Sequence, residues 1–82
     1  MNIMLEISMY PFNEDFKPLI KSFINKFNTY ADLEISTSAT STNIFGEYRY
    51  VMEVLTAMLA WSHEEHGRAV FVSKFIPGYV VE

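Results

Sequence analysis

The sequence has no cysteine, few basic side chains, and only three glycines and three prolines among its 82 residues. The lack of cysteine excludes a disulfide scaffold, a thiolate metal site and a cysteine nucleophile. Six lysines and arginines against ten acids give a net charge of −4. This charge argues against nucleic acid as a partner, because the phosphate backbone requires a basic surface. No segment reaches the roughly 20 apolar residues of a membrane helix, and no basic leader is present. We therefore expect no membrane partner and a cytoplasmic location.

Apolar residues are abundant instead: half of the chain is hydrophobic and 16% is aromatic. This composition excludes a disordered chain, which would need low hydrophobicity and high charge. The length predicts one domain that spans residues 1–82. A domain of this size buries only about 60–65% of its unfolded surface, so we expect another copy of the chain to cover part of the remainder.

Hydrophobic periodicity predicts six elements. Alternating apolar residues indicate strands over 2–9, 33–38 and 69–76, and a shorter strand over 43–46. Apolar residues at spacings of three and four indicate amphipathic helices over 16–27 and 47–66. We assign the aromatic residues of the first helix, Phe16, Phe23 and Phe27, to the core. Gly67 follows the second helix, as is typical of a helix C-terminus.

The order of these elements, βαββαβ, predicts a ferredoxin-like α+β sandwich. Each helix has one apolar stripe, so both helices are expected on one face of a four-stranded antiparallel sheet. The bare face would carry Met4, Glu6, Ser8 and Tyr10 from the first strand. The last strand would add either Phe71, Ser73 and Phe75 or Val70, Val72, Lys74 and Ile76, and the pattern leaves this register open. Either set exposes apolar area, which predicts homo-oligomerisation through the sheet.

Three groups of polar residues could carry chemistry. His63 and His66 are three residues apart on a helix, whereas a metalloprotease helix uses a spacing of four and a third ligand, so we favour a polar helix end and predict no metal site. Glu6 interrupts an apolar strand. It could face solvent, or it could pair with Lys74, Arg49, Arg68, another subunit or a cationic ligand.

The third group consists of hydroxyl residues that precede a glycine and an acid. Thr37, Ser41 and Thr42 lie before Gly46 and Glu47, a pattern typical of turns and helix caps but also suited to a ligand. No serine–histidine–acid signature, phosphate-binding glycine loop or paired-carboxylate motif is present. The residues alone therefore predict a small ferredoxin-like oligomer that binds something, and they neither indicate nor exclude acid–base catalysis.

Three segments in register resemble a known family. They are EISMYP at 6–11, STNIFGEY at 41–48 followed by Val51 and Met52, and AVFVSKFIPG at 69–78. Together they resemble the YkoF-like thiamine-binding family in its single-domain form, over almost the whole chain. The resemblance implies a ferredoxin-like fold, a homodimer or homotetramer, and binding of thiamine or its hydroxymethylpyrimidine part for transport, salvage or sensing, without catalysis or a cofactor. The matching ligand-binding positions are Glu6, Ser8, Tyr10, Ser41, Thr42 and Glu47.

The residue types at these positions suit such a ligand. A carboxylate favours the thiazolium cation, and an aromatic ring adds a cation–π contact. Hydroxyls match the donors and acceptors of the aminopyrimidine. Two alternatives remain: an oligomeric regulatory or scaffold module without a small ligand, and a small enzyme that uses His63 or His66 beside an acid.

Overall fold

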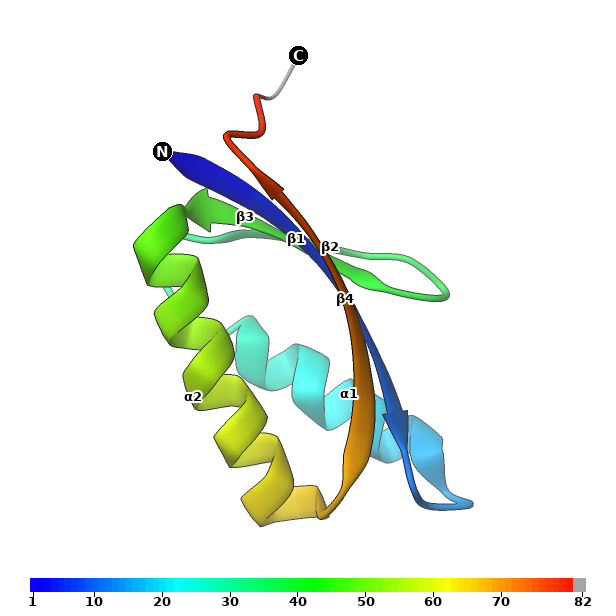
Figure 1. Ribbon diagram of the computed structural model, residues 1–82. Helices are drawn as coiled ribbons and strands as arrows, with labels where there is room; N and C mark the ends of the chain where they lie inside the picture. The colour runs from blue at the N-terminus through cyan, green and yellow to red at the C-terminus, as the bar shows by residue number, and fades with distance from the viewer. Residues whose placement is uncertain (81–82) are drawn as a thin grey trace.

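The computed structural model describes residues 1–80 and contains one four-stranded sheet and two helices (Figure 1). All strand pairs are antiparallel, and the strand order is β2-β3-β1-β4. This arrangement confirms the predicted ferredoxin-like fold. The elements are β1 (Asn2–Pro11), α1 (Phe16–Phe27), β2 (Glu34–Thr37), β3 (Thr42–Glu47), α2 (Tyr48–His66) and β4 (Ala69–Pro77).

The bounds of α1 are as predicted, and those of the other elements differ from the predictions by at most two residues. Strand β1 continues through Pro11, which lies opposite Ala69 at the end of the ladder, where a missing N–H costs little. Strand β2 is shorter than predicted, and β3 is longer at both ends. Helix α2 begins at Tyr48 because Glu47 keeps an extended backbone and acts as the N-cap. At its other end Gly67 has a positive φ of 78°, which a glycine adopts without strain.

The core lies between the helices and one face of the sheet. Both helices cover this same face (Figure 1). Alternate residues of β1 point into it, and each is at most 6% exposed. They pack with Ile44 of β3 and with buried side chains from both helices. The β1 residues are Ile3, Leu5, Ile7 and Met9, and the helical residues are Phe23, Phe27, Val51, Val54, Leu55 and Met58.

The pairing of β1 with β4 decides the register that the sequence left open. Glu6 lies opposite Lys74, and Ser8 lies opposite Val72. Phe71, Ser73 and Phe75 are therefore on the helix side of the sheet. The other face, which we call the open face, carries Met4, Glu6, Ser8 and Tyr10 of β1 and Val70, Val72, Lys74 and Ile76 of β4.

The open face exposes substantial apolar area. The exposed fractions are 46% for Val70, 53% for Val72 and 49% for Ile76. Among residues 1–80, neither helix combines the length and the apolar character that crossing a membrane demands.

Candidate functional site

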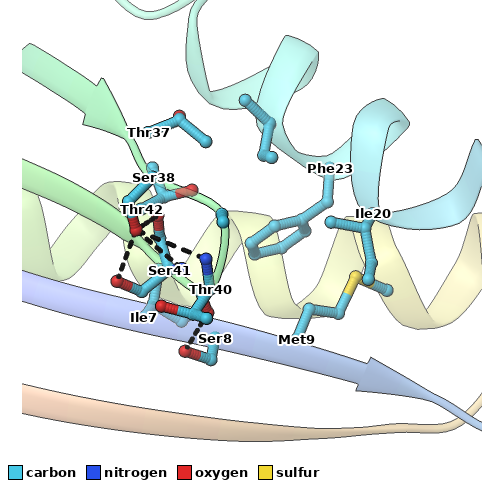
Figure 2. Close-up of a pocket in the computed structure, with 12 residues that line it drawn as sticks. Ile7, Ser8, Met9, Ile20, Phe23, Thr37, Ser38, Thr40, Ser41 and Thr42 are labelled. Carbon is cyan, nitrogen blue, oxygen red and sulfur yellow. Dashed lines mark hydrogen bonds between the residues drawn. The ribbon is translucent and has the colours of Figure 1, made fainter. Parts of the chain in front are cut away.

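The loop between β2 and β3 forms a small cavity with β1 and α1 (Figure 2). Its volume is about 80 Å³. One side carries hydroxyl groups and the other is apolar. The hydroxyl side consists of Ser8, Thr37, Ser38, Thr40, Ser41 and Thr42, and the apolar side of Ile7, Met9, Ile20, Phe23 and Ile24. A cavity of this kind can orient a small ring that is apolar on its faces and polar at its edge.

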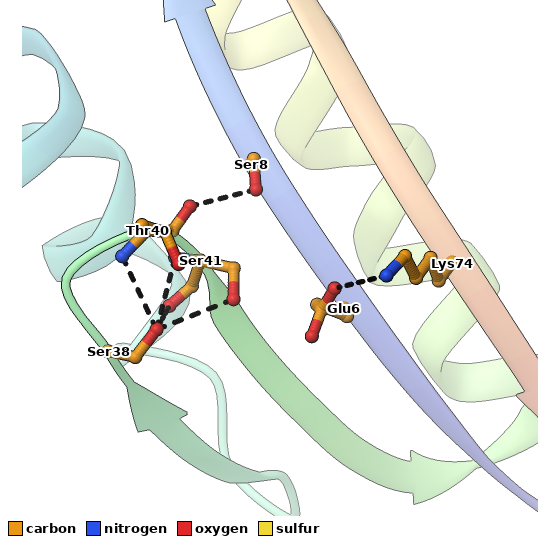
Figure 3. Close-up of polar contacts among 6 residues, drawn as sticks. All are labelled: Glu6, Ser8, Ser38, Thr40, Ser41 and Lys74. Carbon is orange, nitrogen blue, oxygen red and sulfur yellow. Dashed lines mark hydrogen bonds and ion pairs between the residues drawn. The ribbon is translucent and has the colours of Figure 1, made fainter.

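Hydrogen bonds hold the hydroxyl side in place (Figure 3). The Ser38 Oγ accepts hydrogen bonds from the backbone N–H groups of Thr40 and Ser41, at 3.4 and 3.2 Å. The Ser8 Oγ donates to the Thr40 carbonyl at 2.9 Å. This last bond ties the loop to the central strand across 32 residues of sequence. The loop is therefore anchored at both of its ends and in its middle.

A second cavity of about 410 Å³ adjoins the first. The two share Met9, Ile20, Ala39 and Thr40, and the second adds Tyr10, Pro11 and Phe16. We call the two together the hairpin groove. Tyr10 is 56% exposed and Phe16 is 45% exposed, so both rings are accessible to a ligand. None of the described residues that line the hairpin groove is charged at neutral pH.

The structure brings together four of the six predicted site residues. Ser8, Ser41 and Thr42 line the small cavity, and Tyr10 lines the larger one. Thr42 is only 4% exposed, because it lies opposite Ile7 on the helix side of the sheet. Their assignment as ligand contacts stays a prediction, but their positions are compatible with one site.

The two predicted carboxylates lie outside the hairpin groove. Glu47 is at the opposite end of β3 from Thr42, about 17 Å away at roughly 3.4 Å per residue. Its side chain accepts hydrogen bonds from the backbone N–H groups of Arg49 and Tyr50, which is the cap chemistry that the sequence also allowed. Glu6 is on the open face, where its Oε1 lies 3.6 Å from the Nζ of Lys74 (Figure 3).

Sequence reasoning missed three parts of this groove. Ser38 and Thr40 were not selected, although a serine at each end of a short polar turn is a signal for a hydrogen-bonded loop. Phe16 was assigned to the core, but it lies at the first position of α1 and faces the groove instead. Helical spacing alone did not distinguish the core from a groove beside it.

The two histidines lie in different surroundings at the end of α2. Among residues 1–80, no group of three His, Cys, Asp or Glu side chains could hold a metal ion. His63 is exposed. The Nε2 of His66 is 3.0 Å from the Oγ of Ser22, which joins the end of α2 to α1. No acid takes part in this contact.

Comparisons with known proteins identify the fold but not a family. No family model matches the chain, and no curated protein sequence matches it. Among solved structures, the chain is similar to a Thermotoga maritima protein described as a putative thiamine biosynthesis/salvage protein, with a TM-score of 0.82 and 17% identity. That match covers 92% of this chain and 82% of the other.

Two further solved structures share the fold. A Streptococcus pneumoniae protein has a TM-score of 0.86 and 17% identity, over 98% of this chain and 90% of its own. A hypothetical protein from Methanocaldococcus jannaschii has a TM-score of 0.80 and 20% identity, over 99% and 84%. Identities this low support the resemblance to the YkoF-like family at the level of the fold alone.

Proposed function

We propose that this protein binds thiamine, or its hydroxymethylpyrimidine part, in the hairpin groove and performs no catalysis there. The observation that carries the proposal is the lining of the groove: hydroxyls along one side, apolar walls along the other and no charged residue among residues 1–80. The shared fold with a Thermotoga maritima protein that is linked by name to thiamine biosynthesis and salvage supports the same ligand class.

The small cavity suits the aminopyrimidine ring. The ring presents nitrogen acceptors and an amino donor at its edge, and a hydroxyl can serve as either partner. Ser41 and Thr42 supply hydroxyls on one side of the cavity. Phe23 and Ile20 supply the apolar surface against which the faces of the ring can pack.

Aromatic side chains, and not carboxylates, would meet the thiazolium cation. Glu6 and Glu47 lie outside the groove, whereas Tyr10 and Phe16 line its wider part. A cation over an aromatic ring gains about 0.5–2 kcal/mol. This contact is weaker than a buried ion pair, so we expect the pyrimidine part to contribute most of the affinity.

The same lining supports the proposal that the groove binds without catalysis. None of the described residues lining the groove is a histidine, a lysine or a carboxylic acid, the usual general acids and bases near neutral pH. The side chain of His66 is hydrogen-bonded to that of Ser22, and neither residue lines the groove.

A second candidate function, an oligomeric scaffold or regulatory module, is favoured by the open face. Tyr10, Val70, Val72 and Ile76 are each exposed by 46% or more on this face. An apolar patch of this kind is characteristic of an interaction surface. We infer that two copies of the chain pack these faces together, as a homodimer or as part of a homotetramer.

Calorimetry with thiamine and with hydroxymethylpyrimidine tests the proposed ligand. We expect saturable binding of both, and a weakening of about three- to tenfold in Ser41→Ala, because one hydrogen bond is worth about 0.5–1.5 kcal/mol. Ser36→Ala, which changes an exposed serine of β2 outside the groove, is the matched control. An absence of heat for both ligands at millimolar concentration would contradict the proposed ligand and favour the scaffold function.

A further inference from the structure

A separate pocket lies on the outer surface where α1 meets α2. Its volume is about 440 Å³, and it shares no lining residue with the hairpin groove. Five of its lining residues belong to α1, Thr29 follows the end of that helix, and Trp61 comes from α2. We call it the helix-pair pocket.

The α1 residues of this pocket form a second stripe along the helix. Lys21 and Asn25 are four residues apart, as are Ser22 and Lys26, so these side chains lie on one face. The apolar residues Ile20, Phe23 and Ile24 belong to the neighbouring face, which lines the hairpin groove. Within α1 the lining residues run from Pro18 to Lys26, a length of about 12 Å at roughly 1.5 Å per residue.

The charge of the pocket is opposite to that of the protein. The chain has a net charge of −4 and only six lysines and arginines. Two of these, Lys21 and Lys26, line the pocket, and no acid among residues 1–80 does so. Within the described part of the chain, no carboxylate oxygen lies within 4 Å of either ammonium group. The two cations are therefore free to bind an anion.

The pocket also has an aromatic side, which Trp61 forms. The Nζ of Lys26 is 5.7 Å from the centre of the Trp61 ring. The rings of His66 and Trp61 pack edge to face, with their centres 5.6 Å apart. The Nε2 of His66 is in turn hydrogen-bonded to the Oγ of Ser22. These contacts restrain the Trp61 ring next to Lys26, in the pocket that Lys21 also lines.

We propose that the helix-pair pocket binds a phosphate monoester of a small planar molecule, at a site separate from the hairpin groove. The phosphate dianion lies between Lys21 and Lys26, and the side-chain amide of Asn25 is a further donor within the stripe. The planar part of the ligand packs on Trp61, whose ring offers both an apolar face and an indole N–H.

Fluorescence of Trp61 tests this site directly, because Trp61 is the only tryptophan of the chain. The probe is phenyl phosphate, and the neutral comparison is phenol. We expect a saturable change in tryptophan emission with phenyl phosphate that weakens as sodium chloride is added, and a much smaller change with phenol. Equal responses to phenol and phenyl phosphate would overturn the assignment of an anion site, as would no response to phenyl phosphate.

The double variant Lys21→Gln and Lys26→Gln removes both cations. We expect its affinity for phenyl phosphate to fall by about tenfold or more, since a hydrogen bond to a charged group contributes about 1.5–3 kcal/mol. The matched control, Lys17→Gln with Lys74→Gln, changes the net charge equally at positions outside the pocket. Similar losses in the two double variants would show a general effect of charge and contradict the proposal. Thermal melting of both variants shows that each remains folded.

Discussion

The carboxylate of Glu47 accepts hydrogen bonds from two backbone amides in the first turn of α2. These amides have no partner within the helix, so an acidic N-cap satisfies them and also stabilises the positive end of the helix dipole. Glu47 thus contributes to the stability of α2. It lies at the opposite end of β3 from Thr42 and therefore outside the hairpin groove.

The variant Glu47→Ala tests this role. We expect the free energy of unfolding to fall by about 1 kcal/mol, within the usual range of 0.5–2 kcal/mol for loss of a cap. Urea denaturation measures the change, and Glu53→Ala, an exposed position in the middle of α2, is the control. We expect ligand affinity to stay unchanged in Glu47→Ala, and a large loss of affinity in the folded variant would place the carboxylate in the binding site after all.

At the scale of elements, α1 divides its surface among three environments. Phe23 and Phe27 lie in the core and contact each other edge to face at 5.2 Å. Phe16 faces the hairpin groove, and Lys21 faces the helix-pair pocket. One helix of 12 residues therefore contributes to the stability of the fold and to both proposed binding sites.

A pair of phenylalanine variants separates these roles of α1. Phe27 is 1% exposed, its ring centre lies 5.2 Å from that of Phe23, and it does not line the hairpin groove, so Phe27→Ala should lower the free energy of unfolding by about 3–5 kcal/mol. Phe16 is 45% exposed, so Phe16→Ala should cost about 1 kcal/mol or less while it weakens thiamine binding. Denaturation and calorimetry on both variants measure the two effects. A comparable loss of stability in Phe16→Ala would show that this ring supports the core and not the groove.

At the scale of the whole molecule, the asymmetry of the sheet is the main feature. Both helices cover one face, and the open face exposes apolar side chains around a single ion pair, Glu6 with Lys74. That ion pair is partly exposed, and such pairs contribute at most about 1 kcal/mol to stability. The apolar residues that surround it would therefore be the larger source of energy for the proposed association.

The variant Val72→Asp tests association through the open face. Val72 is 53% exposed, so an aspartate there should be tolerated in the monomer but should disfavour an apolar contact between two copies. We expect a lower mass by light scattering than for the unchanged protein. Ala57→Asp, at an exposed position of α2, is the control. If the unchanged protein is already monomeric, or if Val72→Asp keeps the same mass, the open face is not the interface.

Much of the fold was predictable because its signals are local. The alternation in β1 and the spacing of Phe23 and Phe27 in α1 depend only on neighbouring residues, and both appear in the structure as predicted. The register of β4 was not predictable, since both faces of that strand carry apolar residues and only the pairing of Glu6 with Lys74 distinguishes them.

The candidate site was predictable only in part, for the same reason. Ser8 and Thr40 are 32 residues apart and meet only because β1 and the β2–β3 loop are adjacent in the fold. Glu47 follows Thr42 closely in the sequence, yet an extended strand carries the two to opposite ends of the sheet.

The amino-acid sequence by itself determined the order and type of the six elements and the single face of the sheet that the helices cover, because periodicity is a property of neighbouring residues. The tertiary structure alone decided which residues of β4 share the open face, which hydroxyls meet in the hairpin groove, and that Lys21 and Lys26 line one pocket with Trp61. Each of these depends on contacts between segments that are distant in the chain, and such contacts form only when the elements pack together.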